Sequence, residues 1–185
     1  NTLVGRAAAD ALSDADYNVA VGGYSLSTDT LGSKSVAVGY GTLNNQNYTT
    51  ATDSFNTAVG YTAGLSIVTG RYNSIIGALA GDAVTGNGNV VLGYSALTTE
   101  TSGGNATAIG THALNTQNVG GGTNTFNTAC GYVAGYAVTT GTRNTFIGAY
   151  AGDATDDGAQ CVAVGSEALS ANCGNNNVAV GDTAG

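Results

Sequence analysis

The sequence predicts an all-β fold in which the chain winds into a parallel β-solenoid, or β-roll, of about eleven short coils. Two observations lead to this prediction. A five-residue motif that ends in glycine recurs along the whole chain, and successive copies are only 16 to 21 residues apart. A coil of this length has room for short strands and turns, whereas helical solenoids and propeller blades need about 33 residues or more. We therefore expect residues 1–185 to form a single repeat domain.

The motif reads NTAVG at residues 56–60, and the other copies are variants of it. An apolar residue always precedes the closing glycine, and Val, Thr or Ser stands three positions before it. These two positions share one face of an extended chain, so each copy predicts a short β-strand. The closing glycines, which we expect to supply a bend with positive φ, are Gly5, Gly22, Gly39, Gly60, Gly77, Gly93, Gly110, Gly131, Gly148, Gly165 and Gly181.

Both faces of the predicted strands are apolar, because Ala stands at the central position in seven of the eleven copies. Such a strand must be covered on both sides. We expect the Val face, represented by Val59, to point into the coil and Ala58 to point toward a neighbouring chain. A small residue also stands three positions after every glycine, which implies the close approach of another backbone. A homotrimer is the simplest closed assembly that would cover the Ala face.

Two further patterns follow the same repeat. Asn stands four positions before the glycine in eight copies, which predicts a ladder of stacked side-chain amides. The residue four positions after the glycine follows a slower rhythm. Together with the two 21-residue intervals, which lie 71 residues apart, this rhythm predicts a larger unit of four coils. The residues of the slow rhythm are Leu26, Leu43, Gly64, Gly81, Leu97, Leu114, Gly135, Gly152 and Leu169.

The composition argues against several classes of partner. The chain has 12 acidic residues and 4 basic ones, for a net charge of −8, so no basic surface is available for nucleic acid. No run of about 18 apolar residues predicts a membrane span, and the chain opens at Asn1 without a signal-type segment. We expect a piece of a longer fibre or a filament subunit. No cofactor or metal is expected, although a bridge between Cys161 and Cys173 is possible.

The two long coils carry the candidate binding residues. Residues 44–54 and 115–125 each insert about four residues, and such loops often carry recognition. The candidates are Asn47, Tyr48, Asp53, Asn118 and Asn124. The tyrosines that directly follow a glycine, Tyr40, Tyr61, Tyr94 and Tyr132, predict a line of aromatic rings that either packs coil on coil or stacks on sugars.

Catalysis and metal binding find less support in the sequence. His112 is the only histidine, and we expect it in an exposed, tolerant position rather than in a catalytic triad. Two groups of aspartates, at residues 10–16 and 153–157, do not match a calcium-binding loop, so solvated turns are the better interpretation of them. We expect no enzymatic activity.

The motifs NSIIG, SVAVG and NVAVG, each followed by a small residue, resemble the head repeats of trimeric autotransporter adhesins of the YadA type. The longer phrases NTAVGYTAG and NTFIGAYAG resemble repeats of phage tail fibres and bacterial surface fibre proteins. The resemblance extends over all eleven copies, although the coils here are longer than those of the adhesins. It implies a left-handed parallel β-roll that assembles as a tight homotrimer, located outside the cell on a virion tail fibre or a bacterial surface.

The function expected from these features is that of a structural and adhesive fibre segment, a stiff rod that presents loops to a host receptor or glycan. One alternative is a subunit that stacks end to end into a filament. An ice-binding solenoid is a further alternative, but the threonines of the strands lie on the face that we assign to the interior. These are Thr57, Thr107, Thr128 and Thr145. A glycan-cleaving β-helix would need paired carboxylates, and acidic residues are sparse.

Overall fold

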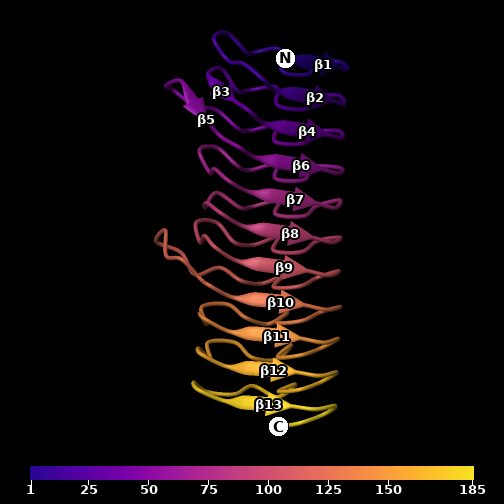
Figure 1. Ribbon diagram of the computed structural model, residues 1–185, viewed down its shortest axis with the longest axis vertical. Helices are drawn as coiled ribbons and strands as arrows, with labels where there is room; N and C mark the ends of the chain where they lie inside the picture. Colours follow the sequence, from indigo (N-terminus) through magenta and orange to yellow (C-terminus); the bar gives the residue numbers. More distant parts are fainter.

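The computed structural model describes residues 1–185 and confirms an all-β parallel solenoid without helices. Figure 1 shows the coils stacked into a column with the two termini at opposite ends. One strand from each coil joins an 11-stranded parallel sheet in the order β1-β2-β4-β6-β7-β8-β9-β10-β11-β12-β13. These strands are β1 (Thr2–Val4), β2 (Val19–Val21), β4 (Val36–Val38), β6 (Thr57–Val59), β7 (Ser74–Ile76), β8 (Val90–Leu92), β9 (Thr107–Ile109), β10 (Thr128–Cys130), β11 (Thr145–Ile147), β12 (Val162–Val164) and β13 (Val178–Val180).

Equivalent motif positions stack directly on one another. Ala58, for example, is paired with Ala37 in the preceding strand and with Ile75 in the following one. The stacking continues beyond the sheet, because only 21 of the 102 backbone hydrogen bonds lie within strands. The return segments also bond coil to coil, as where the amide of Thr62 donates to the carbonyl of Tyr40. Each coil is therefore held to its neighbours around its whole circumference.

The orientation predicted for the strands is wrong, because the central Ala points inward. Ala58 is fully buried, whereas Thr57 and Val59 are only partly buried and lie on the outer face. The small residues three positions after the glycine, such as Ala63, are also buried in the core of the same chain. The strand and the return segment share one narrow interior, and most coils place a large side chain on only one of the two sides. The Ala face therefore needs no second chain to cover it.

The slow Leu and Gly rhythm has its cause in this narrow core. Where the strand contributes a large side chain, the residue four positions after the glycine is Gly: a Cβ at Gly152 would lie 2.6 Å from the ring of Phe146, and one at Gly81 would lie 2.9 Å from Ile75 Cδ1. Where the strand contributes Ala37, the opposite residue is Leu43, and both are fully buried. In these coils the two sides complement each other in volume, whereas Val91 and Leu97 are both buried in one coil.

The closing glycines and the Asn ladder are both present. Gly60 has φ of 138°, and a Cβ there would lie 2.5 Å from the carbonyl oxygen of Gly77, so only glycine fits. The Asn side chains bond mainly to backbone rather than to one another. Asn56 Oδ1 accepts from the amide of Asn73 at 3.0 Å, and Asn56 Nδ2 donates across the coil to the carbonyl of Gly70 at 2.7 Å.

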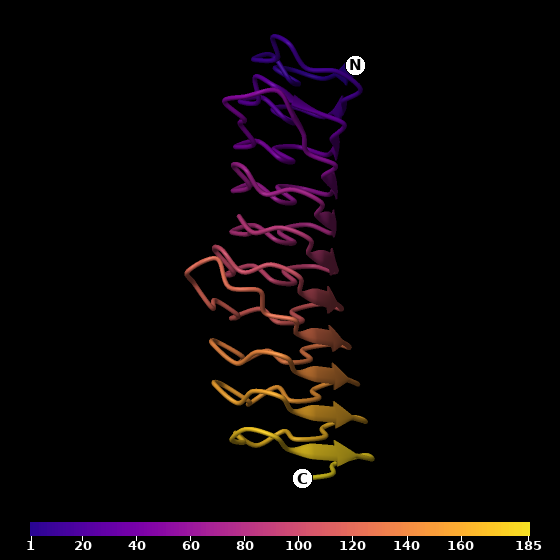
Figure 2. The same cartoon turned by 60° about the vertical axis from the view of Figure 1, so that its left-hand side comes forward.

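Two loops protrude from the column. The first carries β5 (Thr52–Asp53), which pairs in parallel with β3 (Gly32–Ser33) in a separate two-stranded sheet. The second loop, residues 115–125, is joined to the preceding coil by an isolated bridge between Asn124 and Gly104. Figures 1 and 2 show that both loops project on the side away from the strands of the main sheet.

Candidate functional site

The first long loop contains three of the predicted binding residues in different environments. Asp53 is exposed, and its carboxylate lies 2.6 Å from Lys34 Nζ. Asn47 is half-buried and accepts a hydrogen bond from Thr30 Oγ1 at 3.1 Å. Tyr48 is 4% exposed, and its hydroxyl donates to the carbonyl of Gly70 at 2.7 Å. Tyr48 therefore supports the loop from inside and presents no surface to a ligand.

The second long loop contains the other two candidates, which are both exposed. Asn118 Oδ1 accepts a hydrogen bond from Thr101 Oγ1 at 2.9 Å, and Asn124 forms the isolated bridge with Gly104 of the preceding coil. This loop belongs to a different four-coil unit from the first. The structure therefore does not bring the five candidates together into one site.

A buried polar relay, which the sequence interpretation missed, lies beneath the first long loop. Asp29 is fully buried, and Gln46 Nε2 donates to its Oδ2 at 2.6 Å. Gln46 Oε1 in turn accepts from Asn56 Nδ2 at 2.8 Å. Burial, together with the charge of Asp29, raises the pKa of the Tyr48 phenol above its usual range. The relay satisfies polar groups that burial would otherwise leave without partners.

The same relay recurs 71 residues later beneath the second loop. Glu100 is fully buried and accepts from the amide of Gly103 at 2.6 Å and from Gln117 Nε2 at 3.1 Å. Gln117 Oε1 accepts from Asn127 Nδ2 at 2.7 Å. The sequence does show an acidic residue and a glutamine at equivalent positions of both four-coil units, and this repetition could have indicated the relay. Their meeting across the coil depends on the fold.

The outer face of the 11-stranded sheet forms a long strip of apolar side chains. Two outward residues come from each strand, and several large ones are strongly exposed. Thr57, Thr107, Thr128 and Thr145 also lie on this face, so the inward placement predicted for them is wrong. The exposed members are Val4, Ile76, Val90, Leu92, Ile147, Val178 and Val180. No charged residue stands at the outward positions of its strands.

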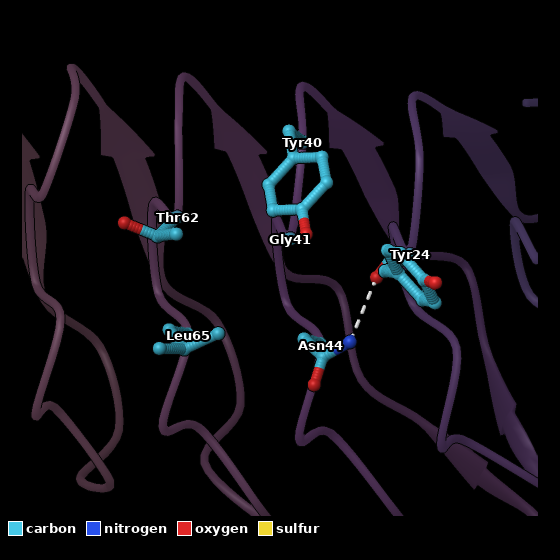
Figure 3. A pocket seen from close by; sticks show the side chains of 6 residues that line it. All are labelled: Tyr24, Tyr40, Gly41, Asn44, Thr62 and Leu65. Carbon is cyan, nitrogen blue, oxygen red and sulfur yellow. Dashed lines mark hydrogen bonds between the residues drawn. The ribbon is translucent and has the colours of Figure 1, made fainter. Parts of the chain in front are cut away.

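The predicted line of tyrosines is present only in part, because Tyr94 packs against His112 and Tyr132 packs against Tyr150 rather than against each other. Tyr40 stacks on Tyr61 with ring centroids 5.7 Å apart and an interplanar angle of 11°, and Tyr24 meets Tyr40 edge to face. Ala78 takes the next place after Tyr61 and interrupts the line. A pocket of about 400 Å³ opens beside Tyr24 and Tyr40, between coils on their return segments. Figure 3 shows the six residues that line it.

His112 is half-buried rather than exposed, which corrects the expectation from the sequence. Its ring lies edge to face with Tyr94 at 5.5 Å and with Tyr136 at 6.3 Å. Its Nδ1 atom is buried without a hydrogen-bond partner. His112 thus acts as a packing residue between two aromatic rings.

The acidic residues remain dispersed. No three His, Cys, Asp or Glu side chains come close enough to hold a metal ion. Burial raises the pKa of Asp82, and it does the same for Asp153, where the charge of Glu167 adds to the effect. Each of these carboxyls has one buried oxygen without a partner.

The structure contains no helix with the length and apolar character needed to cross a membrane. Comparison with models of protein families, with curated proteins and with solved structures finds no match.

Proposed function

We propose that the chain is a structural and adhesive segment of an extracellular fibre, either a phage tail fibre or a bacterial surface adhesin. The observation that carries this proposal is the stacked column itself, in which coil-to-coil hydrogen bonds run around the whole circumference. Eleven coils at a strand spacing of about 4.8 Å make a rod about 50 Å long. The rod holds its two long loops at fixed positions along one side, where a receptor or glycan can reach them.

The proposal includes assembly as a homotrimer, now through the outer face of the main sheet. Large outward side chains such as Leu92 and Ile147 are exposed by 47% and 43%. A contiguous apolar strip of this kind commonly marks a surface that another protein covers. Three copies around an axis parallel to the column would bury the strip on every chain. A left-handed winding, which the resemblance to YadA-type heads implies, is part of the same proposal.

Sedimentation and small-angle scattering test this assembly. We expect an elongated particle with three times the mass of the chain. Leu92→Lys places a charge on the outer face without touching the core, so we expect it to give a folded monomer. Asn118→Lys adds the same charge on an exposed loop and should leave the trimer intact. A compact monomeric wild-type protein would overturn the proposal.

A second function, ice binding, has specific support from the corrected orientation of the strands. Thr107, Thr128 and Thr145 come from three consecutive strands of the outer face, and Thr57 lies on the same face. That face cannot contact ice and be buried in a trimer at the same time. Thermal hysteresis measured on the monomeric fraction would favour ice binding. Its absence, together with a trimer in solution, would leave the fibre proposal alone.

End-to-end stacking into a filament is the remaining alternative. The strands at the two ends of the main sheet, β1 and β13, each have a free edge, and such edges can pair with another chain. Long filaments in electron micrographs would support this alternative, and discrete short rods would count against it.

A further inference from the structure

We propose that the pocket at Gly41 binds one pyranose ring of a glycan. This inference rests on the adhesive function proposed above and gives that function a specific site. The pocket is lined by Tyr24, Tyr40, Gly41, Asn44, Thr62 and Leu65. Its volume of about 400 Å³ falls within the range of small-ligand pockets. Because it lies on the return segments, the site stays open when the outer face of the sheet is covered.

The pocket exists because one side chain is missing from a regular column. The residue two positions after each closing glycine has positive φ and points along the same flank of the rod; Tyr24 and Thr62 occupy this place in the coils on either side of Gly41. A Cβ on Gly41 would meet only Thr62 Cγ2 at 3.3 Å and Leu65 Cδ1 at 3.9 Å. There is thus space for a side chain that the sequence does not supply.

The second four-coil unit shows the same place filled. His112 stands 71 residues after Gly41, has φ of 59° against 65° for Gly41, and packs its ring against Tyr136. Tyr136 itself occupies the place of Leu65. The same place in the coil is therefore empty at Gly41 and filled by an imidazole at His112, where Ser95 and Val133 stand in place of Tyr24 and Thr62. An imidazole fits the space and the backbone conformation.

The lining combines an aromatic surface with one unused polar atom. Tyr40 is 52% exposed, and its ring is held by stacking on Tyr61. Asn44 Nδ2 already donates to the carbonyl of Tyr24 at 2.9 Å and to Ser27 Oγ at 2.7 Å. These bonds fix the amide, as Figure 3 shows for the first of them, and leave Oδ1 as an acceptor for a ligand. Thr62 presents its Cγ2 methyl group to Gly41, and its hydroxyl points away from Gly41 and Tyr40 (Figure 3).

This combination suits a sugar better than other small ligands. One face of a pyranose carries only C–H groups, which pack on an aromatic ring, while its edge carries hydroxyls that donate to an amide oxygen. A purely apolar ligand would leave Asn44 Oδ1 desolvated without a partner, which is costly. A phosphorylated ligand is disfavoured by the net charge of −8. Arg6, which lies 5.4 Å from the centroid of the Tyr24 ring, is the one cation near the pocket.

The test is a titration of the full chain with two soluble probes, a neutral methyl hexoside and the corresponding methyl hexuronoside. Binding is measured by saturation-transfer NMR and by the shifts of the tyrosine ring signals. We expect at least one probe to bind. A stronger response to the hexuronoside would assign a role to Arg6, and an equal response would show that the ring alone is recognised.

Gly41→His is the decisive variant because it copies the arrangement at His112. We expect it to weaken binding by about tenfold or more while circular dichroism stays unchanged. Glu167→His places the same ring at the equivalent, exposed position of a distant coil and should bind like the wild type. Tyr40→Ala is a second variant that removes the stacking surface and should also abolish binding.

Two outcomes would overturn the site: failure of both probes to bind the wild type, or unchanged binding by Gly41→His and Tyr40→Ala. Sedimentation of the same samples separates this failure from failure of the fibre proposal. An elongated trimer without probe binding rejects the pocket alone, whereas a compact monomer rejects the fibre.

Discussion

At the scale of single residues, the fold depends on pairs of side chains that share a narrow space. Phe146 is fully buried, and it fits because Gly152 and Gly135 face it; a Cβ on either glycine would lie less than 3 Å from the Phe146 ring. Elsewhere Leu114 fills the space opposite Ala108. A change on one side of the coil therefore requires a compensating change on the other.

Exchanging the volumes at one such pair tests this complementarity. Phe146→Ala leaves a cavity, so we expect it to lower the free energy of unfolding by about 3–5 kcal/mol. Adding Gly152→Leu recreates the combination seen at Ala108 and Leu114, and we expect it to recover about 1–2 kcal/mol, less than the full loss because Leu is strained at positive φ. Urea unfolding followed by circular dichroism measures both. A double variant less stable than Phe146→Ala alone would contradict this account of the core.

At the scale of the coil, side chains connect the strand to the return segment opposite it. In most coils the Asn four positions before the glycine makes this connection, as Asn144 does by donating to the carbonyl of Gly158 at 2.8 Å. The next coil has Cys161 in the place of Asn, and its sulfur lies 3.8 Å from that of Cys173. Burial raises the pKa of Cys173. A thiol pair thus takes the place of the amide connection.

We predict that oxidation joins Cys161 and Cys173 into a disulfide. The two thiols reduce one molecule of glutathione disulfide to two of glutathione, and the sulfurs need to approach to about 2.05 Å. The bond should raise the free energy of unfolding by about 3 kcal/mol, the chain-entropy estimate for a loop of this size. Peptide mapping under non-reducing conditions identifies the link, and Cys173→Ser is the control. Exclusive cross-linking through the exposed Cys130 would contradict the prediction.

At the scale of the whole molecule, the unit that repeats is four coils rather than one. Three successive coils each have a large buried residue, and the fourth has small residues on both sides, as at Ala58 and Gly64. Side chains of the neighbouring coils lean into this space: a Cβ on Gly64 would meet Leu43 Cδ2 at 3.0 Å and Ile75 Cδ1 at 3.3 Å. The core is therefore shared between coils.

Deletions of different length distinguish a four-coil unit from a single-coil unit. Removing residues 57–127 joins Asn56 to Thr128 and restores an equivalent junction, because every position is replaced by its counterpart 71 residues later. We expect a shorter rod with a cooperative thermal transition. Removing only residues 57–73 brings Leu43 directly beside Ile75, and the overpacking should cost about 1–3 kcal/mol. If thermal unfolding shows the two deletions to be equally tolerated, each coil packs independently of its neighbours.

The periodicity alone was sufficient to predict the parallel solenoid, the strand in each coil and the closing glycines such as Gly60. These features follow from contacts between equivalent positions in adjacent coils, which a repeat displays directly. The inward face could not be assigned in this way, because Ala58 and Val59 are both apolar and alternation then carries no information about burial. The relay of Asp29 and Gln46 and the pocket at Gly41 could not be predicted from the sequence either. They depend on which residues meet across the coil and on one side chain missing from a column, and both become apparent only when the chain is wound in three dimensions.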